Sequence, residues 1–403
     1  MQKKLLSLAI AGALAIPGAA MADLKNVDVY GKIHASWDFV DTESTNDDSD
    51  DNTGAFRNAR LGFKGEEKIS DTLKAEWQVE TELNTADDTN QMKFRNTFVG
   101  IKGDKWGTVR FGKHDTPYKL ATAKLDIFTD TIADYNNIIG AHIADPRALV
   151  DANNVGGNVA SNFNERPGQV VAYITPNFNG FEAAIARASV QNDEGNTAGV
   201  SLENQEAWSA MAKYDNGSFF ASLAYEVFEG GMHRAMGPLN PGDPLVANTS
   251  DGDLDAWKIG LGYQFSNPGK TRIGFVYEDI EQDTSSAAAD DIILAKKASR
   301  DAYGVNFAHD FGANTVKLAY FKADDSDVSN SDDGADNWSI GLDHNFSKRT
   351  KIYGIYTRMD NDKNANYGLY GGQGAGKEDN GFYTSDQNGK DIDAFSVGIV
   401  HKF

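Results

Sequence analysis

The sequence predicts an all-β fold: a transmembrane, sixteen-stranded, antiparallel up-and-down β-barrel. Three observations predict it. Apolar and polar residues alternate along many segments, the connections between these segments are alternately short and long, and the face opposite the apolar one is highly charged. Alternation with a period of two indicates strands, because successive side chains of a strand point to opposite faces. A face this charged is not a packed core, so the barrel should enclose water.

The alternating segments extend over the whole chain after the first 26 residues. The first one, "VDVYGKIHASWDF" at 27–39, puts small and apolar side chains on one face and polar side chains on the other. The others lie near 58–68, 73–83, 93–102, 107–113, 166–175, 181–190, 206–214, 219–229, 254–265, 271–281, 301–310, 315–323, 336–346, 351–359 and 391–403. In the segment 351–359 the alternation fits either phase, so its register stays open.

The connections distinguish a membrane barrel from soluble all-β folds. Short turns rich in Gly, Asn, Pro and Ser, such as "NFNG" and "SNPGK", alternate with long polar connections. A β-sandwich lacks this strict alternation, and a β-propeller would show a repeated motif for each blade. The long connections, which should share one rim, are 40–57, 84–92, 114–165, 191–205, 230–253, 282–300, 324–335 and 360–390. A closed barrel leaves no sheet edge unpaired in lipid.

The first 22 residues are typical of a secretory signal peptide. Lys3 and Lys4 precede an apolar run at 5–16, and the small residues Ala20 and Ala22 mark a cleavage site. The apolar run is shorter than the ~20 residues that a membrane-spanning helix needs. We therefore expect residues 1–22 to be removed and residues 23–403 to form the barrel.

Composition and motif spacing argue against several functions. The net charge of −21 would repel phosphate, so nucleic acid is not an expected partner. The chain has no cysteine, and its seven histidines do not form an HExxH motif, so neither a metal nor a cofactor is expected. The stretch "GGQGAGKE" at 371–378 lacks the Ser or Thr of a phosphate-binding loop, and no GxSxG motif occurs. We predict that the protein is not an enzyme.

Two acidic runs, 41–52 and 324–336, are interpreted as solvated loops. They do not fit the twelve-residue calcium loop that ends in Glu. Weak bridging of divalent ions to lipopolysaccharide phosphates stays open as an alternative.

Four stretches together resemble a known family: "ARLGFKGEE" at 59–67, "FRNTFVGIKGDKWGTVRFGK" at 94–113, "YITPNFNGFEAAI" at 173–185 and the final "FSVGIVHKF". They are similar to the general diffusion porins of gram-negative outer membranes, over nearly the whole mature chain. The resemblance implies a homotrimer of water-filled barrels in the outer membrane, each narrowed by its third long loop, which folds inward. It also implies that the terminal Phe403 is a signal for the outer-membrane assembly machinery.

The third long connection contains a candidate for the inward-folded loop. In "KLDIFTDTIADY" the apolar residues fall at helical spacing, and three aspartates recur on roughly the opposite face. We expect a short helix whose apolar side packs on the barrel wall and whose carboxylates point into the lumen; an ordinary solvated helix or an external loop is the alternative. The apolar residues are Leu125, Phe128, Ile132 and Tyr135, and the acidic ones are Asp126, Asp130 and Asp134.

The resemblance further implies a basic wall opposite this loop. By motif that role falls to Lys32, Arg60, Arg95 and Arg166, with Lys64, Arg110 and Lys113 as secondary candidates. Acidic and basic walls that face each other across a narrow passage create a transverse field in which polar solutes orient. The alternative is that these side chains simply pair with carboxylates on neighbouring strands.

The expected function is therefore a general diffusion channel for small hydrophilic solutes and ions, with a modest cation preference from the three aspartates and the net charge. A solute-selective channel, or a barrel that binds a partner at the cell surface without significant transport, are the alternatives. Outer-membrane lipids and lipopolysaccharide would surround the barrel.

Overall fold

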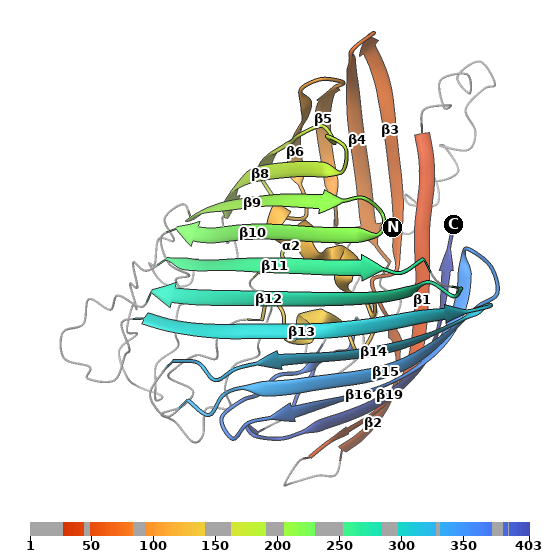
Figure 1. The fold of residues 1–403 in the computed structure, drawn as a ribbon, viewed down its shortest axis with the longest axis vertical. Helices are drawn as coiled ribbons and strands as arrows, with labels where there is room; N and C mark the ends of the chain where they lie inside the picture. Colours follow the sequence, from red (N-terminus) through yellow and green to blue (C-terminus); the bar gives the residue numbers. More distant parts are fainter. Residues whose placement is uncertain are drawn as a thin grey trace, which may run out of the picture.

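The wall is a closed, antiparallel, sixteen-stranded barrel, as predicted (Figure 1). The computed structural model describes residues 27–43, 49–83, 93–141, 163–190, 205–229, 253–266, 268–283, 297–327, 331–372, 382–385 and 387–403. The expected signal peptide, 1–22, lies outside the described residues. Among those residues no helix is both long and apolar enough to cross a membrane.

Each strand pairs with its neighbours along the wall, and β1 closes the ring with β19. The segments β2 and β3 lie end to end along β1 and together form the second of the sixteen strands. The wall strands are β1 (Val27–Thr42), β2 (Ser49–Phe56), β3 (Arg60–Ser70), β4 (Leu73–Glu82), β5 (Thr97–Gly103), β6 (Gly107–Lys113), β7 (Val170–Ile174), β8 (Phe181–Val190), β9 (Gln205–Asp215), β10 (Phe219–Glu229), β11 (Leu254–Gln264), β12 (Thr271–Asp283), β13 (Lys297–Phe311), β14 (Asn314–Ala323), β15 (Ala335–Asn345), β16 (Thr350–Asn361) and β19 (Ile392–Lys402). A two-stranded pair, β17 (Leu369–Tyr370) and β18 (Phe382–Tyr383), stands apart from the wall.

The second wall strand begins earlier than predicted. Strand β2 lies inside the stretch 40–57 that we expected to be a loop, and β2 and β3 pair in succession with the same partner, β1. Between them, three residues lie opposite two on β1, and Asn58 has a φ of 47°. This is a β-bulge, which bends the strand and redirects side chains. The acidic composition of 41–52 concealed the strand.

The alternation of faces follows the sequence. On β19 the exposed residues are Phe395, Val397 and Ile399, while Ser396 between them is fully buried. The register that stayed open for 351–359 is settled in β16. There Tyr353, Ile355 and Met359 are buried toward the interior, and Ile352 is exposed on the outer face.

The terminal Phe403 closes the seam between β1 and β19. Its backbone N–H donates to the carbonyl of Gly31 at 3.1 Å, and the Gly31 N–H donates back at 3.0 Å. The ring lies directly over Gly31, where an added Cβ would come within 2.3 Å of the ring atom Cζ. The chain end is therefore part of the sheet.

This packing predicts that Gly31→Ala weakens the seam. The methyl group would also lie 2.7 Å from the backbone oxygen of Arg60, which cannot move freely. Overpacking of this kind costs about 1–3 kcal/mol. We expect a smaller folded fraction, measured by the heat-modifiable mobility of the barrel on gels. Gly54→Ala is the matched control, because its Cβ would meet atoms only at 3.5 Å or beyond. Equal folding of both variants would contradict the prediction.

Candidate pore constriction

The described residues of the third long loop, which include 114–141, lie inside the barrel, as expected from the apolar residues of the loop (Figure 1). It begins with α2 (Pro117–Thr122), which starts at a Thr116 cap, and continues with the 3₁₀ turns η3 (Ala123–Leu125) and η4 (Tyr135–Asn137). Phe128 and Ile132 are buried against the wall. The expected helix over "KLDIFTDTIADY" is wrong, because this stretch forms turns and short 3₁₀ segments instead.

The three loop aspartates consequently do not form one lumen-facing row. Asp134 closes a turn: one carboxylate oxygen accepts from the Asn136 N–H at 3.0 Å, and the other accepts from the Asp130 N–H at 2.7 Å. Asp126 accepts from the Phe128 N–H at 2.9 Å, and its second oxygen is buried with no hydrogen-bond partner among the described residues. Burial and the nearby Asp134 charge raise the pKa of Asp126, which disfavours its charged form.

Asp130 connects the loop to the opposite wall. It forms an ion pair with Lys32 of β1, and its other oxygen accepts from the Asn58 side chain at 2.5 Å. Asp130 has a φ of 61°, in the left-handed region. The loop carboxylate and a residue of the basic wall therefore touch each other.

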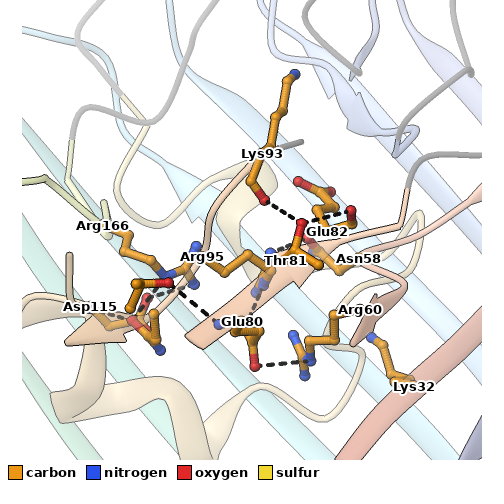
Figure 2. Close-up of polar contacts among 12 residues, drawn as sticks. Lys32, Asn58, Arg60, Glu80, Thr81, Glu82, Lys93, Arg95, Asp115 and Arg166 are labelled. Carbon is orange, nitrogen blue, oxygen red and sulfur yellow. Dashed lines mark hydrogen bonds and ion pairs between the residues drawn. The ribbon is translucent and has the colours of Figure 1, made fainter. Parts of the chain in front are cut away.

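The basic residues Arg60 and Arg95 meet at a single carboxylate, that of Glu80 on β4. The Arg95 Nε donates to Glu80 Oε1 at 2.8 Å, and the Arg60 Nε lies 4.0 Å from Glu80 Oε2 (Figure 2). Arg95 also donates to the Asn58 side chain at 2.7 Å. The Arg60 side chain is 28% exposed and that of Glu80 7%. Arg60 is thus the more accessible charge of this group.

Arg166 forms a second group with Asp115 at the two ends of the third loop. Its Nη2 lies 2.7 Å from Asp115 Oδ1, and Lys119 approaches the same oxygen at 3.1 Å. Asn96 bridges the group, since it donates to Asp115 at 2.6 Å and accepts from Arg166 at 3.0 Å. These two cations hold the pKa of Asp115 well below its usual range, although burial acts in the opposite direction.

The secondary candidates make other contacts than the four basic residues above. Arg110 donates to Glu76 at 2.5 Å, and the Lys64 ammonium lies 5.3 Å from the centre of the Tyr30 ring. Lys113 ends β6 and is half-buried. Arg110 therefore fits the alternative of simple pairing with a strand carboxylate, as do Arg60 and Arg95 through Glu80.

Sequence reasoning missed the residues that hold the loop in place. Glu278 of β12 accepts from the Gly140 N–H at 2.6 Å, the Tyr118 hydroxyl at 2.7 Å and Arg300 at 3.1 Å. Lys258 of β11 donates to Asn164. All these side chains are buried. The alternation along β11 and β12 predicts which charged residues face inward, but it does not predict which loop these residues contact.

The Asp130 contact predicts that the loop loosens in acid. Burial raises the pKa of this carboxyl, but Lys32 and Arg60 outweigh it and lower the pKa from 3.8 to about 2. Such a shift corresponds to about 2 kcal/mol. A carboxyl group whose pKa is lower in the folded state stabilises that state above pH ~4. This stabilisation is lost as the pH falls through about 2. We expect open-channel current noise to rise in this range.

Asp130→Asn should remove this acid dependence and show the raised noise already at pH 5. A variant whose noise still changed between pH 4 and pH 2 as in the wild type would assign the transition to another group.

Comparison with known proteins identifies the family. The family model described as Gram-negative porin matches residues 7–364. The chain belongs to this family. Outer membrane porin protein 32 of Delftia acidovorans is 26% identical over 421 aligned positions, which cover 100% of both chains. Major outer membrane protein P.IB of Neisseria sicca is 27% identical over 366 positions, covering 87% of this chain and 91% of the relative. The porin is thus an outer-membrane channel, as its sequence resemblance implied.

Solved porin structures share its fold. An anion-selective porin from Comamonas acidovorans superposes with a TM-score of 0.67 at 21% identity, covering 94% of this porin and 99% of the other chain. OmpT of Vibrio cholerae in its trimer form gives a TM-score of 0.63 at 16% identity, covering 94% and 99%. At identities of 21% and 16%, these similarities show that the fold is shared.

Proposed function

We propose that the porin is a general diffusion channel, which allows passive passage of small hydrophilic solutes and ions. The observation that carries the proposal is the ionised cluster at the third loop, where the Arg60 side chain is 28% exposed beside a loop that is otherwise mostly buried. Charged side chains of this kind need water around them, so the passage that they line is wet.

The ion preference that we propose is for anions, contrary to the expectation from the loop aspartates. Asp130 is neutralised by Lys32, Asp134 closes a turn, and Asp126 is buried. Among the described residues, Arg60 and Arg95 share the carboxylate of Glu80 in their ion pairs, and Arg166 and Lys119 share that of Asp115. Glu82 and Lys93, one charge of each sign, lie at the edge of this cluster (Figure 2). The solved structure described as anion-selective supports the same sign.

We further propose a homotrimer in the outer membrane, surrounded by lipid and lipopolysaccharide. The outer wall presents an apolar belt for lipid or protein contact, with Leu223, Ile273, Val305 and Leu342 each about half exposed. The trimer form of OmpT is one of the similar structures.

Single-channel recording of the purified porin in a planar bilayer tests the channel itself. We expect ohmic steps, grouped in threes for a trimer, and a reversal potential that favours anions across a salt gradient. Liposome swelling with uncharged sugars of increasing size then distinguishes general diffusion from selectivity. In a general diffusion channel the swelling rate should follow solute size, whereas a selective channel should admit one class of solute faster than its size predicts. Silence at high protein load would leave a barrel that binds a partner without transport.

Phe403 is proposed to signal assembly as well as to close the seam. Deletion of Phe403 should lower the yield of folded porin in the outer membrane, while the channels that do form keep nearly the wild-type conductance. The side chain lies on the outer wall and is 43% exposed even in the closed barrel. Refolding into detergent without any assembly machinery is the control. An equal loss of folded porin in the outer membrane and in detergent would mean that Phe403 acts only by closing the seam between β1 and β19.

A further inference from the structure

Three wall strands end with the same short motif, a histidine followed two residues later by a phenylalanine. The motif reads "HDF" at 309–311 where β13 ends, "HNF" at 344–346 where β15 ends and "HKF" at 401–403 where β19 ends. Both residues of each motif lie on the outer face of the barrel, and the three phenyl rings are between 43% and 62% exposed. The diffusion of solutes through the lumen uses none of these side chains.

A side chain from the neighbouring strand holds each imidazole ring by its Nδ1 atom. In all three cases the partner is the first residue of that strand, on β12, β14 or β16. The three hydrogen bonds join His309 Nδ1 to Thr271 Oγ1 at 2.9 Å, His401 Nδ1 to Thr350 Oγ1 at 2.9 Å and His344 Nδ1 to Asn314 Oδ1 at 2.8 Å. One arrangement therefore occurs three times, and within the described part of the chain it leaves the Nε2 atom of each ring without a hydrogen-bond partner.

The register of the sheet places the three histidines at one depth in the membrane. On β14, Val316 lies opposite both His309 of β13 and Leu342 of β15. His344 is two residues beyond Leu342, and the step from His344 to His401 on β19 is the same. Two residues extend about 6.8 Å along a strand and two strand spacings are about 9.6 Å, which corresponds to a slope of about 35°. Barrel strands are tilted by about this angle, so the rings lie level with one another beside the short periplasmic turns.

The charge of the outer face differs between its two ends. At the periplasmic end the turns that precede β12 and β16 add Lys270, Lys348 and Arg349, all exposed. From β12 to β19, the described residues of this end have no side-chain carboxylate on the outer face or in the turns, and the negative group there is the chain terminus at Phe403. At the opposite end six strands each present an aspartate: Asp255, Asp279, Asp301, Asp336, Asp360 and Asp393. The periplasmic end is thus complementary to an anionic partner.

We propose that these three histidine–phenylalanine ends bind anionic phospholipids of the periplasmic leaflet, each imidazole contacting a head-group phosphate. A protonated imidazole donates from both nitrogens, so a ring whose Nδ1 is already bonded still offers its Nε2–H to a phosphate oxygen. Aromatic rings of membrane barrels lie at the level of the head groups, where the phenylalanines place the histidines. Lys270, Lys348 and Arg349 add attraction to an anionic lipid surface.

A second copy of the chain fits this surface less well, because a protein interface would bury the imidazoles and the nearby cations without carboxylate partners. The outer-membrane location follows from the family. The inference therefore depends neither on the proposed ion preference nor on the conductance of the channel.

The test is electron paramagnetic resonance of spin-labelled lipids around the folded porin in phosphatidylcholine vesicles. The wild-type porin should restrict the motion of labelled phosphatidylglycerol about twofold or more over labelled phosphatidylcholine. Replacement of all three histidines by alanine should remove most of this preference. The matched control is the combined substitution Val305→Ala, Ile340→Ala and Val397→Ala, since these exposed residues lie on the same strands, each four positions before a histidine. It should leave the preference unchanged.

A wild-type porin without a preference for phosphatidylglycerol, or a triple histidine variant that retains the wild-type preference, would overturn the inference. If this variant retained the preference but lost its trimers on unheated gels, the three ends would instead be contacts between copies of the chain. The combined change Lys348→Gln and Arg349→Gln should weaken the preference mainly at low salt, because exposed charges are screened. If the triple histidine variant does not fold, His344→Ala measured against Ile340→Ala tests the same contact at one site, and equal preferences in this pair would overturn it.

Discussion

Replacement of Arg60 by Gln should shift the reversal potential of the channel toward cations. Arg60 is the most exposed cation of the group around Glu80, and its removal leaves Glu80 with Arg95 as its single guanidinium partner. A unit charge about 5 Å from a passing ion in water is worth about 0.8 kcal/mol, so the permeability of each ion should change by up to about fourfold, downward for anions and upward for cations. The shift should shrink at high salt, where the charge is screened.

Two further variants make this measurement decisive. Glu80→Gln removes a charge of the opposite sign from the same place and should shift the reversal potential toward anions. Lys68→Gln removes a positive charge at the rim, where the side chain is 65% exposed and paired with Asp71, and should change little. An unchanged reversal potential in Arg60→Gln, or an equal shift in Lys68→Gln, would place the selective charge elsewhere.

The wall could be predicted from the sequence because its determinants are local. Alternation along a strand decides which side chains face lipid, and Phe395, Val397 and Ile399 lie outside as their spacing predicted. For β16 the sequence left the register open, but it did predict the strand. The β2 strand was missed because acidic residues at a rim carry no apolar face to reveal it.

The inward loops could be predicted only in part, because their structure depends on distant contacts. The apolar residues of the third loop were correctly expected to pack on the wall. Helical spacing nevertheless misplaced Asp134, whose carboxylate closes a local turn with Asn136 and Asp130. Arg57 stood in a polar stretch with no distinguishing neighbour. Its contacts with Asp38 and with the backbone carbonyl of Tyr370 form only in the folded structure, so the sequence could not predict them.

Replacement of Glu278 by Ala should loosen the third loop more than any other single change proposed here. Glu278 accepts hydrogen bonds from Tyr118 near the start of the loop and from Gly140 further along it. Its loss also leaves Arg300 buried without its carboxylate partner. Removal of one partner of a buried ion pair costs about 3–5 kcal/mol. We expect a barrel that still forms, but whose current is noisy and interrupted by closures.

Glu278→Gln separates charge from shape in this network. The amide keeps an oxygen that can accept from Gly140 or Tyr118, but it cannot neutralise Arg300, so its noise should lie between that of the wild type and Glu278→Ala. Glu182→Ala is the matched control, since Glu182 pairs with Lys213 on the neighbouring wall strand at 2.7 Å. Wild-type noise in Glu278→Ala, measured together with its thermal unfolding, would mean that the apolar packing of Phe128 and Ile132 alone is enough to hold the loop.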